Sequence, residues 1–137
     1  DDVLEPFIDA DDIADIAVAA LTDDKHVGQL YEVTGPRLMT FRDLVAEVSK
    51  ATGREIRYIP ISFDEYQAGM LEHGVPEDLA KGLTELFRAI LDGRSSYVTD
   101  GVQRALGRAP RDFSEFAREM AQAGVWSAPA ASAQSHP

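Results

Sequence analysis

The stretch Phe7-Ile-Asp-Ala-Asp-Asp-Ile-Ala-Asp-Ile-Ala-Val-Ala-Ala-Leu21 decides the fold class, because it predicts a short strand that leads directly into an amphipathic helix. The strand is expected over residues 7–10. Asp11 or Asp12 is expected to cap the helix, since a carboxylate accepts the free N–H groups at a helix N-terminus. Apolar side chains then recur at intervals of three and four residues, which places them on one helix face: Ile13, Ile16, Ala17, Ala20 and Leu21.

Two more strands and a helix are expected before residue 62. Residues 30–34 alternate between apolar and polar side chains and are rich in strand formers, and Gly35-Pro36 then predicts a turn. A helix is expected from Thr40 to just before Gly53, because glycine commonly follows a helix C-terminus. Residues 56–61 form the next expected strand, in which Pro60 favours a sheet edge or a strand end.

From residue 62 onward the pattern predicts helices alone. Ser62-Phe-Asp-Glu65 has the form of a capping box, and Pro76 suits the first position of a helix that continues to about Asp92. Shorter helices are expected after Asp100 and Asp112. The apolar residues of the helix that starts at Pro76 are expected to face inward: Leu79, Leu83, Leu86, Phe87, Ile90 and Leu91.

Length and charge limit the function classes. A chain of 137 residues suits one domain or part of one. The net charge of −11 argues against nucleic-acid binding and against an anionic membrane surface, both of which need clustered Lys and Arg. No apolar stretch approaches the ~20 residues that span a bilayer, and the acidic Asp1-Asp2 does not have the form of a secretory signal. A cytoplasmic protein is therefore expected, with neither nucleic acid nor membrane as a partner.

Motifs that carry catalysis are absent from the sequence. The chain has no cysteine, and no two of its ten glycines stand two positions apart, so neither G-x-G-x-x-G nor a P-loop can be written. No tyrosine has a lysine four residues later. His26, His73 and His136 stand outside any metal or nucleophile motif and are expected to be solvated. No catalytic and no cofactor-binding residue is therefore assigned.

Two charged clusters have a structural and a functional interpretation. Asp11-Asp-Ile-Ala-Asp15 matches an aspartate-rich pattern that chelates magnesium, but helix capping explains it better because no second acidic motif faces it. No metal site is expected. Arg104, Arg108 and Arg111 form a small basic group around Pro110 that favours internal ion pairs, with an acidic ligand as the alternative.

An apolar and aromatic set in the helical half is a candidate pocket wall. It consists of Phe63, Tyr66 and Met70 together with Phe87 and Tyr97. Helices that carry such residues can enclose a ligand pocket. The alternative is that these side chains only build the core.

Three segments together resemble the later half of the NmrA-like proteins, which are atypical members of the short-chain dehydrogenase/reductase superfamily. The first is the stretch that begins at Phe7, the second is Leu30-Tyr-Glu-Val-Thr-Gly-Pro36 followed by Thr40-Phe41, and the third extends from Val98 to Phe113. The resemblance covers about residues 7–126, in order and with matching lengths.

The resemblance implies an α/β fold with two or three short strands and a mostly helical C-terminal lobe, completing a Rossmann-type domain whose N-terminal half is absent. Residues 1–6 are then a leader, residues 7–61 complete the sheet, residues 62–126 form a substrate-side lobe, and residues 127–137 form a disordered tail. The family's substrate pocket corresponds to Phe7, Phe63, Tyr66 and Met70. Its NADP(H) loop belongs to the absent half, so the chain alone is expected to bind no cofactor, whereas the full-length parent is expected to bind NADP(H).

The implied function is the substrate-binding C-terminal portion of an NAD(P)H-dependent oxidoreductase, which is not expected to be an active enzyme alone. The small-molecule substrates of the family include quinones and azo dyes. The alternatives are a non-catalytic small-ligand or redox-sensing regulatory module, and a helical interaction domain. Strands without neighbours would leave an open edge and an apolar patch, so self-association or pairing with an N-terminal Rossmann half is predicted.

Overall fold

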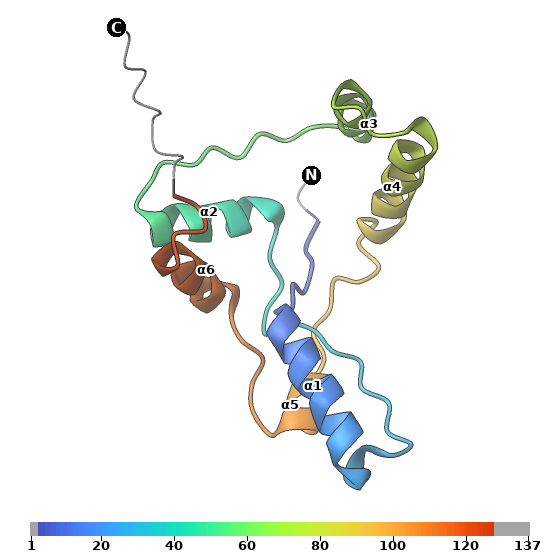
Figure 1. Ribbon diagram of the computed structural model, residues 1–137, viewed down its shortest axis with the longest axis vertical. Helices are drawn as coiled ribbons and strands as arrows, with labels where there is room; N and C mark the ends of the chain where they lie inside the picture. The colour runs from blue at the N-terminus through green and yellow to red at the C-terminus, as the bar shows by residue number, and fades with distance from the viewer. Residues whose placement is uncertain (1–2, 128–137) are drawn as a thin grey trace, which may run out of the picture.

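The computed structural model describes residues 3–127, and helices are the regular secondary structure of that part of the chain. Figure 1 shows helices associated in pairs: α1 with α5, α2 with α6, and α3 with α4. The α3–α4 hairpin stands apart from the other pairs and is joined to them by extended connections. The elements are α1 (Ala10–Thr22), the 3-10 turn η1 (Asp24–His26), α2 (Phe41–Thr52), α3 (Phe63–Glu72), α4 (Glu77–Ile90), α5 (Gly101–Leu106) and α6 (Phe113–Gln122).

The expected strands do not form between residues 3 and 127, so this part of the predicted fold class is wrong. Residues 7–10 lead straight into α1, and residues 30–34 and 56–61 lie outside any ladder. Glu5 and Met39 form an isolated antiparallel β-bridge, in which the N–H group of each residue donates to the carbonyl of the other at 2.9 and 3.0 Å. The alternating pattern predicts a strand that needs neighbours, and the described residues supply none. Leu30 is consequently 85% exposed and Ile59 68%.

Helix starts follow the capping residues, with one correction. Asp9, and not Asp11 or Asp12, caps α1 by accepting the Asp11 N–H at 2.9 Å. The expected capping box forms at the beginning of α3, a second capping box forms at the beginning of α2, and α2 ends at Gly53, whose φ of 65° is left-handed.

Asp12 does not cap α1 because it joins α1 to the connection between α5 and α6. Its carboxylate accepts from Arg108 Nη1 at 2.5 Å and from the Arg111 N–H at 2.8 Å. The other guanidinium arm of Arg108 reaches Asp15 at 2.6 Å, and Arg111 pairs with Asp9 at 3.1 Å. The prediction that this basic group makes internal ion pairs is confirmed for Arg108 and Arg111.

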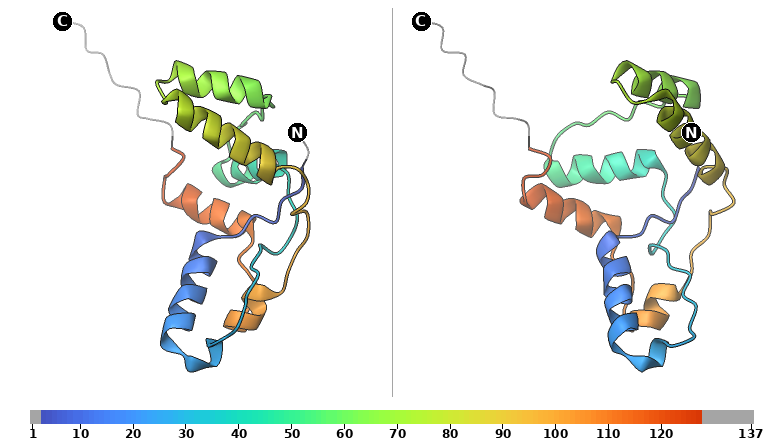
Figure 2. Two further views of the ribbon diagram at one scale, coloured as in Figure 1. Left: turned by 90° about the vertical axis from the view of Figure 1, so that its right-hand side faces the viewer. Right: turned by 45° about the vertical axis from the view of Figure 1, so that its right-hand side comes forward.

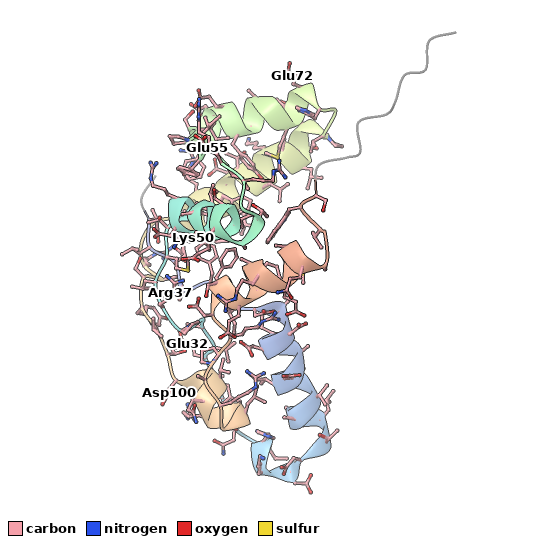
Figure 3. All side chains as sticks on the ribbon, turned by 90° about the vertical axis from the view of Figure 1, so that its left-hand side faces the viewer. Glu32, Arg37, Lys50, Glu55, Glu72 and Asp100 are labelled. Atoms are coloured by element: carbon pink, nitrogen blue, oxygen red, sulfur yellow. The ribbon has the colours of Figure 1, made fainter. Side chains whose placement is uncertain are left out.

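Two glycines permit close backbone approach between segments that are distant in the sequence. A Cβ added at Gly35 would lie 1.8 Å from the Phe7 carbonyl oxygen, and one at Gly101 would lie 1.9 Å from that of Glu32. The Thr99 hydroxyl also donates to the Glu32 carbonyl at 2.7 Å. Figure 3 shows the two neighbouring segments through the labelled side chains of Glu32 and Asp100.

The buried apolar core of the described residues is small and consists of Met39, Ala80, Val102, Ala105 and Ala117. Helix α4 does not bury its apolar stripe as expected, since Leu79, Leu86 and Ile90 are 53%, 51% and 43% exposed. The hairpin that α4 forms with α3 covers one side of α4 and leaves the other open (Figure 2). The predicted tail, residues 127–137, lies outside the described residues except for Ser127.

Candidate functional site

A groove of about 840 Å³ lies where the α3–α4 hairpin meets the rest of the chain. This volume is within the range of about 300–1,000 Å³ that is common for small-molecule sites. The N-terminal segment, the beginnings of α2 and α3, the extended residues 58–61 and the end of α4 all contribute walls. The lining residues are Val3, Phe41, Tyr58, Ile59, Pro60, Ile61, Ser62, Phe63, Asp64, Glu65, Tyr66, Phe87, Arg88 and Leu91.

Aromatic rings dominate the walls of the groove. Tyr66 meets Phe87 edge-to-face with ring centroids 5.6 Å apart, which joins α3 to α4. The Arg88 guanidinium lies 4.7 Å from the centre of the Phe63 ring, and that of Arg42 lies 4.9 Å from the centre of the Tyr58 ring. Such rings offer flat apolar surface to a planar ligand, and the stacked guanidinium groups extend it.

The four residues predicted for a substrate pocket divide into three groups. Phe63 and Tyr66 line the groove. Phe7 does not, but its ring packs edge-to-face on the lining residue Phe41, with centroids 5.2 Å apart. Met70 lies further along α3 and is not part of the lining. Their role in binding substrate stays a prediction.

Sequence reasoning missed the contribution of residues 58–61 to the groove. It interpreted the alternating pattern of that segment as a strand, whereas the segment bridges α2 and α3 and presents Tyr58 and Ile59 to the groove. It did include Phe87 among the candidates. Tyr97, which it also included, is not among the lining residues, and its hydroxyl donates to the Glu32 carboxylate instead.

The described lining of the groove contains more carboxylates than cationic side chains. The Glu65 carboxylate accepts from the N–H and the hydroxyl of Ser62, both at 2.7 Å, and these bonds lower the pKa of Glu65. Glu65 is therefore ionised at neutral pH. Arg88 is the one cationic residue among the described residues of the lining, and it already pairs with Asp64 at 3.4 Å and Glu85 at 3.7 Å.

Glu5, in the N-terminal segment, is a buried carboxylate that is not part of the groove lining. It is 9% exposed, and its Oε1 atom has no hydrogen-bond partner within residues 3–127. The backbone of Glu5 pairs with Met39, which is 2% exposed. A buried carboxylate normally has a partner, because its desolvation is otherwise uncompensated.

His26 is the second buried polar side chain with a free atom. It is 5% exposed, which makes the expectation of a solvated histidine wrong. Its Nδ1 lies 2.9 Å from the Tyr31 hydroxyl, and the Arg104 guanidinium lies 5.4 Å from the centre of the Tyr31 ring. Burial follows from this packing of η1 on the next segment, which residue spacing does not reveal. Nε2 has no partner in the described part of the chain.

A smaller pocket of about 470 Å³ lies between the ends of α2 and α6 and contains Lys50, Arg54 and Arg118. Arg54 Nη1 donates to the Trp126 carbonyl at 2.6 Å. Both helices present their carbonyl ends here, and these favour cations. The bond from Arg54 joins the segment after α2 to the segment after α6.

Neither a metal cluster nor a membrane span is found among residues 3–127. No group of three or more His, Cys, Asp or Glu side chains there could hold a metal ion. No helix in that range is long and apolar enough to cross a bilayer.

Comparison with known proteins gives consistent relatives, although no family model matches the chain. It is 39% identical over 117 residues to an NAD(P)H azoreductase of Xenophilus azovorans. This match covers 85% of this chain and 41% of the relative. It is 40% identical over 120 residues to an uncharacterized oxidoreductase of Bacillus subtilis, covering 88% and 41%. The structure of Citrobacter sp. triphenylmethane reductase complexed with NADP(H) matches with a TM-score of 0.72 at 25% identity, covering 88% and 41%. The chain thus spans about two fifths of the length of these relatives.

Proposed function

Since this chain belongs to the NmrA-like NAD(P)-binding reductases and matches the C-terminal part of their fold, we propose that it is the substrate-binding portion of an NAD(P)H-dependent oxidoreductase. The aromatic groove at the base of the α3–α4 hairpin supports this proposal most directly. Its flat walls suit a planar acceptor such as a quinone or an azo compound. Phe63 and Tyr66 contact the acceptor, while Phe7 holds Phe41 in place behind it.

The residues of the groove do not suit the pyrophosphate of a dinucleotide. Glu65 is held ionised and Asp64 stands beside it, so two phosphate charges would be repelled. The sequence also lacks a glycine-rich phosphate loop. NADP(H) binding therefore belongs to the part of the relatives that this chain does not cover, and this chain alone is inactive. The cofactor supplies the hydride, and this chain orients the acceptor.

Exposed apolar side chains support a partner for this chain. Leu21, Val27 and Leu30 are 86%, 76% and 85% exposed near the end of α1 and the segment that follows it. Large apolar side chains that are this exposed often mark a contact with another protein segment when they lie together. The nucleotide-binding portion of such a reductase covers this surface. Size-exclusion chromatography with light scattering is expected to show self-association of the chain alone, and a stable monomer at high concentration would contradict the proposal.

Binding of 1,4-naphthoquinone to the full chain, followed by calorimetry, tests the role of the groove. Tyr66→Ala is expected to weaken binding by about tenfold, because it removes ring contacts and loosens Phe87. Tyr97→Phe is the matched control, since Tyr97 is not part of the lining. If Tyr66→Ala and Tyr97→Phe bind the quinone alike, the groove is not the acceptor site, and an interaction domain without a small ligand becomes the better explanation.

A further inference from the structure

Three cationic side chains gather in the smaller pocket, which lies where the C-terminal ends of α2 and α6 are side by side (Figure 1). They are Lys50, Arg54 and Arg118, and no described residue of the lining is an aspartate or a glutamate. The chain as a whole has 24 acidic and 13 basic residues. The pocket therefore reverses the charge of the protein around it, which favours an anionic ligand.

The two helix ends account for only part of this positive charge. Each helix C-terminus is equivalent to about half a negative charge, so the two ends together offset about one cation. The end of α6 is also closed by its own backbone, since the N–H groups of Gly124 and Val125 donate to carbonyls of its last turn at 3.1 Å. Lys50 pairs with Glu47 at 3.2 Å, which offsets a second charge. The pocket thus holds more cations than its helix ends require.

Trp126 provides an aromatic wall in a fixed position. Its ring meets Phe116 of α6 edge-to-face, with ring centroids 6.2 Å apart. Its carbonyl accepts from Arg54 Nη1 at 2.6 Å, so the aromatic wall and one guanidinium group are held together. The Arg54 carbonyl in turn accepts from the hydroxyl of Ser49 on α2 at 2.5 Å. Walls that are fixed before a ligand arrives reduce the entropic cost of binding.

We propose that this pocket binds phosphomonoesters that carry a small ring. A guanidinium group presents parallel N–H donors that match the oxygens of a phosphate, and the pocket contains two such groups together with the point charge of Lys50. The volume of about 470 Å³ leaves room beside the phosphate, where the ring of the ligand packs on Trp126. No described residue lines both this pocket and the groove at the α3–α4 hairpin, so this inference does not depend on the proposed function.

Trp126 is the one tryptophan of the sequence, so its fluorescence reports directly on this pocket. The probe is benzyl phosphate, titrated into the full chain at pH 8, where a phosphomonoester is a dianion because its second pKa is about 6. Sodium chloride at about 0.15 M screens weak attraction to other exposed cations. A saturable change in Trp126 emission is expected with benzyl phosphate and no saturable change with benzyl alcohol. An equal response to both compounds would show that the pocket takes only the ring, and the inference would fail.

Arg118→Gln tests the role of the guanidinium groups. Arg118 lies on the exposed side of α6, and glutamine suits a helix, so the melting temperature is expected to stay the same. Binding of benzyl phosphate is expected to weaken about tenfold, as the loss of one charge-assisted phosphate contact provides. Arg94→Gln is the matched control, because it removes an exposed arginine outside the lining and changes the net charge equally. If the two variants bind benzyl phosphate alike, this pocket is not the site.

Inorganic phosphate separates the contribution of the phosphate from that of the ring. It makes no stacking contact with Trp126, so about tenfold more of it is expected to be needed to displace benzyl phosphate. If inorganic phosphate competes as well as an equal concentration of unmodified benzyl phosphate, the ring contributes nothing and the assignment to phosphomonoesters is wrong.

Discussion

Replacing Arg108 by methionine is expected to reveal how strongly α1 depends on the connection between α5 and α6. Among residues 3–127, the change leaves the Asp12 side chain, which is 2% exposed, with the Arg111 N–H as its one remaining donor. Removing one partner of a fully buried ion pair costs about 3–5 kcal/mol. Arg108 is 44% exposed, so solvent screening reduces this value, and a loss of about 2 kcal/mol in the free energy of unfolding is expected.

A double-mutant cycle gives the sharper form of this prediction. Asp12→Asn retains an acceptor for the Arg111 N–H but removes the charge, so its cost is expected to be about 1–2 kcal/mol. In the double variant no buried charge is left unpaired, and the combined loss is expected to fall about 1 kcal/mol or more below the sum of the single losses. Urea unfolding followed by circular dichroism measures all three values.

Arg94→Met is the matched control for that experiment. Arg94 pairs with Asp92 at 2.5 Å, but the two side chains are 78% and 35% exposed, and such pairs contribute little. If Arg108→Met destabilises the chain no more than Arg94→Met does, the pairing of Asp12 does not hold α1 in place.

Three further outcomes are expected. Gly101→Ala should prevent folding or lower the melting temperature strongly, because the added Cβ would lie 1.9 Å from the Glu32 carbonyl oxygen. Gly82→Ala is the control: Gly82 has open space around it inside α4, so this change should stabilise the fold by about 0.5–1 kcal/mol. Similar melting temperatures for the two variants would refute the close approach at Gly101. Arg37 donates to Asp112 at 2.7 Å and holds the pKa of Asp112 far below its ordinary value. The stability that this ion pair contributes is therefore present above about pH 4 and is lost as the pH falls further. Asp112→Asn should make the urea midpoint less dependent on pH between pH 5 and pH 2, and an unchanged pH dependence would contradict this. Leu30→Asn should raise solubility without lowering the unfolding midpoint, since Leu30 is 85% exposed. Light scattering that shows no less aggregation for the variant than for the original chain would contradict this.

The helices could be predicted from the sequence because their signals are local. Thr40, the capping box at Ser62 and the glycine at position 53 mark boundaries within a few residues, and the structure has α2 and α3 at those positions. The ion pairs of Arg108 and Arg111 followed from the scarcity of basic residues among many acids.

Features that depend on distant neighbours could not be predicted in the same way. Residues 30–34 and 56–61 have the side-chain pattern of strands, but a ladder forms only when other strands lie beside it. The same dependence explains the open side of α4, where Leu79 and Leu86 have no neighbours to cover them. The burial of His26 depends on one contact with Tyr31 that no spacing rule describes.

Half of the groove followed from the helical pattern, and the other half did not. Phe63 and Tyr66 stand on one side of α3, three residues apart, which the sequence shows directly. The walls that were not predicted include a segment thought to be a strand, the beginning of α2, and the N-terminal segment, whose pairing with Met39 joins residues far apart in the chain.

The pairing of helices also fixes an order of events during synthesis. The α3–α4 hairpin joins neighbours in sequence, so it can form as soon as both helices have left the ribosome. Helix α1 must wait for Arg108 and Arg111, which lie 96 and 99 residues beyond Asp12, and α2 must wait for α6. Contacts between such distant residues form slowly because a long loop must close first. The ion pairs of Asp12 therefore form only after the connection between α5 and α6 has been synthesised, and until then α1 lacks its attachment to that connection.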